Sequence, residues 1–341
     1  MKKGSKFFYT SLIIFVLSLF LFILSRRSEF FAKLFSDTVG AFLRNALLIF
    51  SNLIPFSLFE LILVLLPAIA VLCIYFLKKA SGVAVKKRFL SMLGAFLLIF
   101  SLSINTFFVS FGKSSEMKIP MPQENEVSLA LSRLAEKLNS FENPTYPDRE
   151  ELSFKLYSAY SSLEQYSISL TAELPKIKKI KNEALASRLG ILGKYSSLTS
   201  EVSVNFSAPE YTVCFSTAHE LAHLFGISGE GEACFLAFLA SLETEDEGIM
   251  YSACLSAFEA VFAEFSLSYK ELSQKIYNSL PERAKKDISE YSLFYYKNHG
   301  KITDTADKAN GALLDFATQG KETDYSLFSR LLVAYLTSCG N

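Results

Sequence analysis

Three long apolar segments in the N-terminal third restrict what this chain can fold into. Residues 7–25 and 89–111 carry no charged side chain, and residues 53–77 carry only Glu60. Each is close to the roughly 20 residues that an α-helix needs to cross the hydrocarbon core of a bilayer. No comparable segment follows Gly112. We therefore expect a membrane anchor with three transmembrane helices at residues 1–111, a polar linker at residues 112–127 and a water-exposed domain at residues 128–341.

The first apolar segment follows a basic start, with Lys2, Lys3 and Lys6, as the core of a secretory signal peptide does. Its apolar core is long, however, and the sequence SRRSEF after it has no small-x-small cleavage site. We therefore expect the segment to be retained as a transmembrane anchor.

Two further features lie near the expected membrane boundary. Residues 26–51 are apolar with scattered charges, which predicts an amphipathic helix in the membrane interface rather than a fourth span. Glu60 is a carboxylate within the second apolar segment, and such residues are often functional. It lies close to the outer end of that segment, so we expect its side chain to reach the interface.

The basic residues of the short loops predict the orientation in the membrane. Lys2, Lys3 and Lys6 precede the first segment, and five lysines and arginines lie at positions 78–88, between the second and third segments. Both groups lie on the same side of a three-span arrangement, which is then the cytoplasmic side. We expect a multi-pass protein of the cell membrane, in contact with the lipid bilayer, whose residues 112–341 lie outside the cytoplasm.

The remaining sequence indicates a mainly α fold with a small β element. Half of the chain is hydrophobic and the formal net charge is zero, which argues against disorder and against a nucleic-acid-binding protein. Strict alternation in EVSVNF, residues 201–206, predicts one strand. Apolar positions recur at intervals of three and four, as in helices, over residues 128–141, 149–172, 248–278 and 323–336.

The predicted strand leads directly into a helix. Ser207 and Glu210 have the spacing of a capping box and Pro209 suits a first turn, so we expect this helix to begin near Ala208. Gly226 is a typical helix stop, and a second apolar helix is expected to begin a few residues later.

The first of these two helices contains the sequence HELAH, which holds two of the three histidines of the chain. Residues four apart share one face of a helix, so His219 and His223 can bind the same Zn²⁺ ion. Glu220 projects at a neighbouring angle and can reach a water without binding the metal. Zinc lowers the pKa of that water towards about 7. Glu220 then takes its proton and passes it to the leaving amine.

A catalytic zinc site needs a third protein ligand and one open position. Glu230 is expected in the first turn of the second helix, beside the end of the first, and is our candidate. Glu232 is the alternative. It lies about 200° around the helix from Glu230, so the two carboxylates cannot both face one ion.

The segment HELAHLFGISGEGEACFLAFLA, residues 219–240, resembles the active-site segment of an uncharacterised bacterial family, catalogued as a domain of unknown function (DUF3810-like). The similarity extends to SSLTSEVSVNFSAPEY, to MYSACLSAF and to DYSLFSRLLVAYL. It implies three N-terminal membrane spans and a mostly helical, zincin-like domain of the gluzincin type. The position of Glu230 is also similar to the ligand glutamate of HtpX-type membrane zincins. Those proteins carry an aspartate where this chain has Cys234, and gluzincins use that aspartate to orient a ligand histidine.

An oxyanion formed during peptide hydrolysis needs a hydrogen-bond donor opposite the zinc. Tyr325 lies in a segment that matches the family and is our candidate, with Tyr251 and His299 as alternatives. The strand at residues 201–206 is expected to lie at a sheet edge and to pair with an extended substrate. Glu201 and Asn205 would then line the cleft.

Together these features predict a membrane-anchored zinc-dependent metallopeptidase acting on a peptide or protein substrate outside the cytoplasm. One alternative is a non-catalytic zinc-binding scaffold or sensor of the envelope, and another is a helical membrane protein without metal. Glu220 favours the peptidase, since structural zinc sites use four protein ligands and need no general base. The sequence does not predict the substrate, the disulfide pairing or the oligomeric state.

Overall fold

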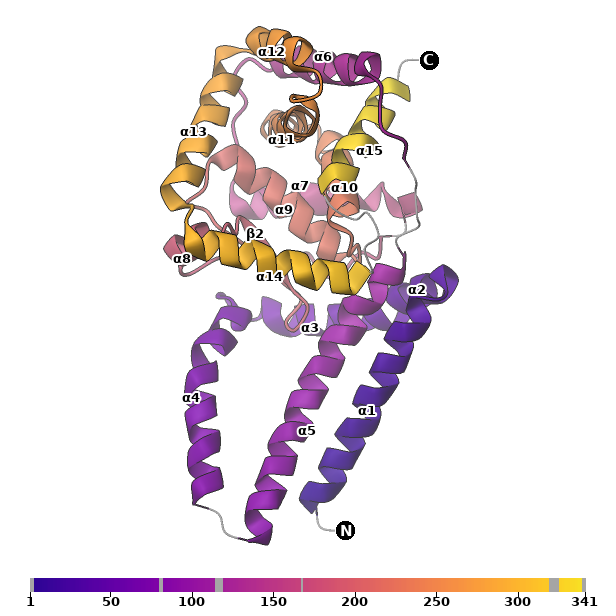
Figure 1. The fold of residues 1–341 in the computed structure, drawn as a ribbon, viewed down its shortest axis with the longest axis vertical. Helices are drawn as coiled ribbons and strands as arrows, with labels where there is room; N and C mark the ends of the chain where they lie inside the picture. The colour runs from indigo at the N-terminus through magenta and orange to yellow at the C-terminus, as the bar shows by residue number, and fades with distance from the viewer. Residues whose placement is uncertain (1–2, 80–81, 114–118, 167, 319–324, 339–341) are drawn as a thin grey trace.

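The computed structural model describes residues 3–79, 82–113, 119–166, 168–318 and 325–338, and within them the chain is mainly helical, as the sequence predicts. Long helices form one end of the molecule and a folded domain of shorter helices with a small sheet forms the other (Figure 1). The long helices are α1 (Lys3–Ser25), α4 (Leu58–Lys78) and α5 (Val83–Thr106). Residues 114–118, in the predicted linker, lie outside the described residues, and the domain's first helix begins at Glu124.

Among the described residues, five helices are long and apolar enough to cross a membrane. Four are near the N-terminus, which supports membrane association of that region: Lys6–Ser25, Glu29–Asn52, Leu58–Lys78 and Val83–Phe111. The fifth is α11 (Glu247–Phe265), so the expectation that no comparable apolar segment follows Gly112 is wrong by length and composition. Because 61% of its most apolar window is buried inside the domain, α11 serves as a core helix.

Two of the apolar helices differ from their predicted bounds. The segment predicted at residues 53–77 becomes helical only at Leu58, because the Ser57 hydroxyl caps α4 by accepting the N–H of Glu60 at 3.2 Å. The segment predicted at residues 89–111 begins earlier, at Val83, since its three basic residues are good helix formers. It ends at Thr106 and is followed by the 3₁₀ turn η2 (Phe108–Lys113).

Residues 29–52 form α2 (Glu29–Phe35), a π-helical turn η1 (Ser36–Gly40) and α3 (Ala41–Asn52). This run lies across the ends of the long helices at the base of the folded domain (Figure 1). Arg44 of α3 is fully buried there. Its guanidinium donates to the carbonyl of Thr106 at 3.2 Å and to that of Ser36 at 3.1 Å, which ties α3 to the end of α5.

In the folded domain, α9, α10 and α11 pack against one another, with α6 and α15 closing the core around side chains such as Leu221, Ala237 and Phe258. The helices predicted at residues 149–172 and 248–278 are interrupted at serine-rich sequence, where hydroxyls compete for the helix backbone. The domain helices are α6 (Glu124–Ser140), α7 (Arg149–Ser161), η3 (Glu164–Tyr166), α8 (Glu183–Arg188), α9 (Glu210–Leu224), α10 (Glu230–Glu243), α11, α12 (Lys270–Ser279), α13 (Glu282–Asn298), α14 (Lys301–Thr318) and α15 (Tyr325–Ser338).

The small sheet has the strand order β1 (Lys178–Lys179), β3 (Glu201–Val204), β2 (Gly193–Ser196). Strand β3 pairs in parallel with β1 and antiparallel with β2. The strand predicted at residues 201–206 therefore exists in shortened form, but its expected position at an edge is wrong. Since a strand lies on each of its sides, β3 is the central strand of the sheet and not the edge at which a substrate would add a strand.

The expected placement of Glu201 and Asn205 in a cleft is also wrong, because both side chains are buried. The Glu201 carboxylate forms an ion pair with Lys178 and accepts the N–H groups of Leu58 at 2.9 Å and Phe59 at 3.0 Å. It thus places negative charge at the N-terminus of α4, where a helix stabilises an anion. Asn205 donates to the Ser187 hydroxyl at 2.9 Å. Both residues join the sheet to neighbouring helices.

The start of α9 also differs from the prediction. The helix begins at Glu210 with Pro209 at the N-cap, and no side chain caps it. Ser207 does not form the expected capping box, because its hydroxyl donates instead to the Asn205 side chain at 2.7 Å.

Candidate metal centre

A sharp reversal of the chain brings the ends of α9 and α10 together. After α9, Gly226 has a φ of +94°, a left-handed conformation that glycine adopts without strain. The N–H of Ile227 reaches back to the carbonyl of Ala222 at 3.1 Å, as in a Schellman motif. The predicted stop at Gly226 is confirmed, and the next helix begins at Glu230. The first turn of α10 therefore faces the last turns of α9.

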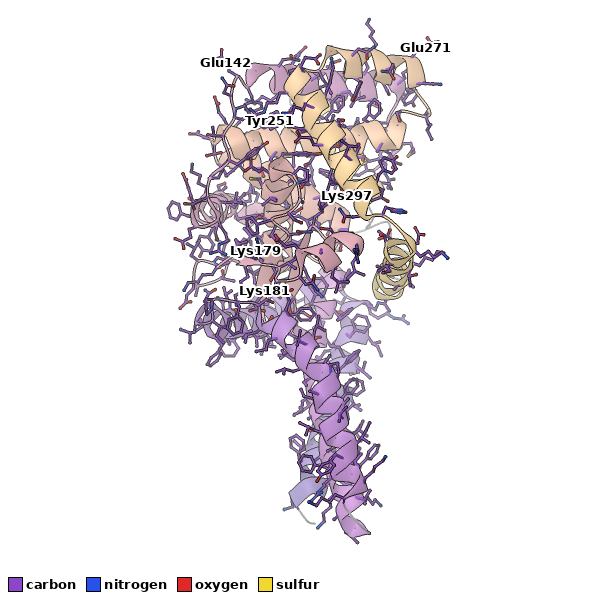
Figure 2. The ribbon with its side chains drawn as sticks, turned by 90° about the vertical axis from the view of Figure 1, so that its left-hand side faces the viewer. Glu142, Lys179, Lys181, Tyr251, Glu271 and Lys297 are labelled. Atoms are coloured by element: carbon purple, nitrogen blue, oxygen red, sulfur yellow. The ribbon has the colours of Figure 1, made fainter. Side chains whose placement is uncertain are left out.

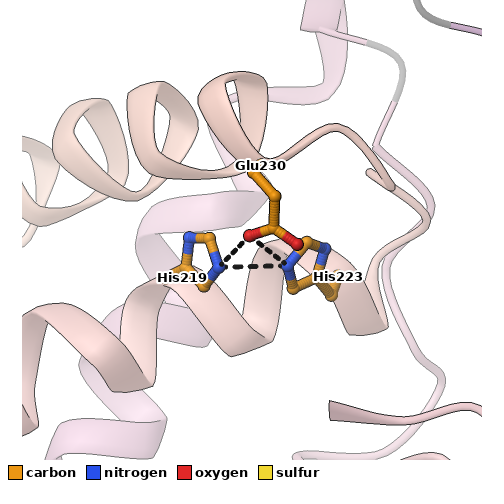
Figure 3. Close-up of side chains that lie close together, drawn as sticks. All are labelled: His219, His223 and Glu230. Atoms are coloured by element: carbon orange, nitrogen blue, oxygen red, sulfur yellow. Dashed lines mark hydrogen bonds and ion pairs between the residues drawn. The ribbon is translucent and has the colours of Figure 1, made fainter. Parts of the chain in front are cut away.

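This reversal gathers two imidazoles and a carboxylate (Figure 3). The Nε2 atoms of His219 and His223 are 3.0 Å apart, and Oε2 of Glu230 lies 3.2 Å from the first and 3.6 Å from the second. In the described part of the chain, these three residues form the group of His, Cys, Asp and Glu side chains that could hold a metal ion. Glu232 is not a member, in keeping with its different angle on the helix.

Contacts on the far side of each imidazole fix the ring orientation. Nδ1 of His223 is 2.7 Å from the carbonyl oxygen of Ile227. A carbonyl can only accept, so this nitrogen carries the hydrogen and Nε2 keeps its lone pair for a metal. Nδ1 of His219 is 3.2 Å from Sγ of Cys234. Cys234 thus makes the contact that the resemblance assigned to an aspartate, and both rings present Nε2 to the same point.

Glu230 and the imidazoles of this group change one another's pKa values. Burial alone would raise the pKa of the Glu230 carboxyl, but His223 and His219 hold that pKa well below its usual range. Burial alone would lower the pKa of His219, but Cys234 and Glu230 raise it well above its usual range. Glu230 is therefore held as a carboxylate beside the two imidazoles. A divalent cation between them would meet that negative charge.

Glu220 lies on α9 between the two histidines, but it is not part of the ligand group. Its side chain is buried under β2, and the N–H of Tyr195 donates to its Oε2 at 2.5 Å. Burial raises the pKa of Glu220, an effect that His219 and His223 partly offset. A carboxylate of this kind is a stronger base than one in water.

Strand β2 was not predicted from the sequence, although it holds Glu220 in place. Its sequence, GKYS, lacks the alternation that reveals a half-buried strand. Gly193 was the available signal, since a glycine in a strand often marks the close approach of another group. A Cβ atom on Gly193 would lie 2.7 Å from Cγ and 3.0 Å from Oε1 of Glu220. Glycine is therefore required for the close approach of this strand to the Glu220 side chain.

We expect a Gly193→Ala substitution to push Glu220 aside and to destabilise the fold by about 1–3 kcal/mol, the usual range for overpacking a buried site. Thermal unfolding of the full chain in detergent measures this effect. Gly300→Ala is the matched control, because a Cβ there meets no atom within 4 Å. Equal melting temperatures for the two variants would contradict the close approach.

Sequence comparison places this centre within a known family. A sequence model of the family described as "Protein of unknown function (DUF3810)" matches residues 35–333. The chain belongs to the DUF3810 family. The match includes the HELAH motif and Glu230, so the resemblance noted in the motif is confirmed as family membership. Searches of curated proteins and of solved structures found no match to the DUF3810 chain.

The other predicted site residues of this DUF3810 chain are Tyr325, Tyr251 and His299, and each belongs to a different part of the chain. Tyr325 begins α15, but its side chain lies outside the described residues. Tyr251 is buried in the part of the domain that lies away from the long helices (Figure 2), and its hydroxyl donates to Asp287 at 2.6 Å. That bond engages Tyr251 in the core of the domain, so it is a poor oxyanion donor. His299 follows α13, with Nε2 3.3 Å from Asp304.

The end of a long apolar helix contacts the candidate metal centre of the DUF3810 chain directly. Phe107, the C-cap of α5, has its ring centroid 5.7 Å from that of His223 and 5.7 Å from that of Tyr195. At Gly226, a Cβ atom would lie 2.7 Å from Nη2 of the buried Arg44. The centre is thus fixed relative to both α5 and α3, which sequence reasoning did not foresee.

Proposed function

We propose that this DUF3810 protein is a membrane-anchored zinc-dependent metallopeptidase, a hydrolase of peptide bonds, with its active site outside the cytoplasm. The observation that carries the proposal is the convergence of His219, His223 and Glu230 within 4.8 Å beside a buried glutamate that is not a ligand. This combination is what an HExxH peptidase requires.

The residues present fit a catalytic zinc ion. Two imidazole nitrogens and one carboxylate oxygen are a common donor set for catalytic zinc, and three protein ligands leave a fourth position open. The bond from His223 to Ile227 leaves the metal-facing nitrogen unprotonated, as metal binding requires. Further support comes from the described cluster itself, which contains no fourth protein ligand that would close the site.

Bound Zn²⁺ would supply a Lewis acid that polarises the scissile carbonyl and lowers the pKa of water. Glu220 would act as the general base, taking a proton from the attacking water and giving it to the leaving amine. Tyr195 holds one carboxylate oxygen by its N–H, and the other oxygen is then the one that moves the proton. The raised pKa of Glu220 suits a base working near neutral pH.

We infer that α1, α4 and α5 are the three membrane spans and that residues 29–52 lie along the interface. In support, α1, α4 and α5 extend away from the domain together, whereas α2 and α3 cross their ends (Figure 1). The start of α1, the end of α4 and the start of α5, with basic residues at 78–79 and 86–88, lie at the end far from the domain. By the positive-inside rule that end is cytoplasmic, and the domain is outside the cytoplasm.

The domain itself is proposed to be zincin-like. The motif helix lies under an antiparallel strand, and the next helix supplies the third ligand, as in gluzincins. The substrate is proposed to be a peptide or protein. Because Phe107 places the centre beside the end of α5, polypeptide close to the membrane surface would be within reach.

Zinc content of the purified full chain tests the metal centre. We expect the wild type to hold about one Zn²⁺ per chain and His223→Ala to lose it, since two remaining ligands do not retain the ion. His299→Ala is the matched control, because this third histidine is outside the ligand group. A wild type that stays free of zinc after incubation with it, or a His223→Ala variant that binds as well, would refute the centre.

A further inference from the structure

A cavity lies on the side of the sheet where α4 meets the domain. It has a volume of about 120 Å³ and lies between the first turns of α4, helix α8 and strands β2 and β3. Its lining is mostly apolar and includes Phe59 and Leu63 of α4, Leu185 of α8, Leu189, Ile191 and Lys194.

The cavity continues onto the apolar surface of α4. Within α4 no residue is buried, and Leu63 at the cavity is 47% exposed. From Leu63 towards Lys78 the helix shows exposed leucine, isoleucine and valine side chains over a length that can cross a membrane. A hydrocarbon chain lying along α4 could therefore enter the cavity without leaving an apolar environment.

Lys194 provides a positive charge at this cavity. Its Nζ lies 3.7 Å from the centre of the Phe59 ring, and no hydrogen bond or ion pair joins the amine to another described residue. The nearby Glu60 is engaged elsewhere, since both of its oxygens accept the N–H of Lys181, at 3.1 and 2.9 Å. Burial lowers the pKa of Lys194, and the charges of Glu220 and Glu60 partly offset this effect.

The walls of the cavity are held in place by hydrogen bonds. Glu201 binds the first turn of α4 to β3, and Glu60 binds the same turn to the segment after β1. Figure 2 shows Lys179 and Lys181 where the domain meets α4. Lys179 pairs with Glu183 at 3.0 Å, so Lys181 is the lysine that adds positive charge at the level where lipid headgroups would lie.

We propose that this cavity binds one phospholipid, with an acyl chain along α4 and the phosphate on Lys194. A phosphodiester is ionised at neutral pH and forms short, charge-assisted hydrogen bonds with an ammonium group. The apolar lining and the Lys194 amine match the two parts of such a lipid, while Glu60, which also lines the cavity, is held by the N–H of Lys181. This site involves none of the metal ligands, although Lys194 stands on β2 between two residues that contact Glu220, Gly193 and Tyr195. Lipid retention is therefore measured without any readout of peptidase activity.

Native mass spectrometry of the full chain tests the proposal. The protein is reconstituted in phosphatidylglycerol vesicles, extracted in detergent and weighed with its retained lipid. We expect the wild type to retain one phospholipid and Lys194→Ala to retain it roughly tenfold less well, the loss expected for one charged hydrogen bond. Lys286→Ala is the control, because this exposed lysine pairs with Glu290 on α13.

A second pair of variants tests the acyl-chain path. Leu63→Trp fills the cavity mouth and is expected to expel the lipid. Leu65→Trp adds the same ring to the same helix but points about 200° away, and is expected to retain the lipid. The proposal is overturned if the wild type retains no lipid, or if Lys194→Ala and Leu63→Trp retain as much as their controls.

Discussion

Peptide hydrolysis is expected to fall about 10²–10⁴-fold when Glu220 is replaced by glutamine, the usual contribution of a general base. Zinc content should stay at the wild-type level, because Glu220 is outside the ligand group. The amide retains the shape of the carboxylate and can still meet the N–H of Tyr195 through its oxygen, but it cannot take a proton from water. Cleavage of a peptide library by the zinc-loaded full chain, measured alongside metal content, separates these two properties.

Glu232→Gln is the matched control for this experiment. It changes a glutamate in the same region, on α10, that does not belong to the ligand group. We expect it to keep both zinc and activity. Equal cleavage by wild type and Glu220→Gln would contradict the role of general base. A zinc-loaded wild type that cleaves no peptide would instead favour the non-catalytic scaffold or sensor, and loss of zinc from Glu232→Gln would contradict the assignment of Glu230.

The Glu201→Ala substitution is expected to destabilise the protein by about 3–5 kcal/mol, because it leaves a buried charge without its partner. Lys178 and Glu201 have side chains only 3% and 0% exposed. The lysine also donates to the carbonyl of Ser51 at 2.9 Å, so it cannot move out to water without breaking the junction with α3. Chemical denaturation of the full chain in detergent measures the free energy of unfolding.

Two further variants make this result specific. Replacing both partners, Lys178→Met with Glu201→Leu, should recover much of the lost stability, since no uncompensated charge remains. Glu282→Ala is the control. Its ion pair with Lys285 is at the surface, with the glutamate 92% exposed, and such pairs contribute about 0–1 kcal/mol. If Glu201→Ala changes stability no more than Glu282→Ala, the buried pair does not hold α4 to the sheet.

The local features of this protein could be predicted from its sequence. A helix places residues four apart on one face, so HELAH determines that His219 and His223 point the same way. The stop at Gly226 and the restart at Glu230 follow from equally short-range rules of helix termination. The long apolar segments could likewise be predicted from composition and length alone. All these elements can be predicted without knowing which residues pack against them.

Tertiary structure alone decided how these elements meet. The two-residue strand β1 and the strand β2 have no distinctive pattern, so neither the central position of β3 nor the contact of Tyr195 with Glu220 could be derived. The contact of Phe107 with His223 joins residues more than a hundred positions apart. Strand order and burial depend on such long-range pairings, whose partners a periodic pattern does not specify. The sequence therefore determined which side chains could bind a metal, and the packing of α3, α4, α5 and β2 around them determined their surroundings.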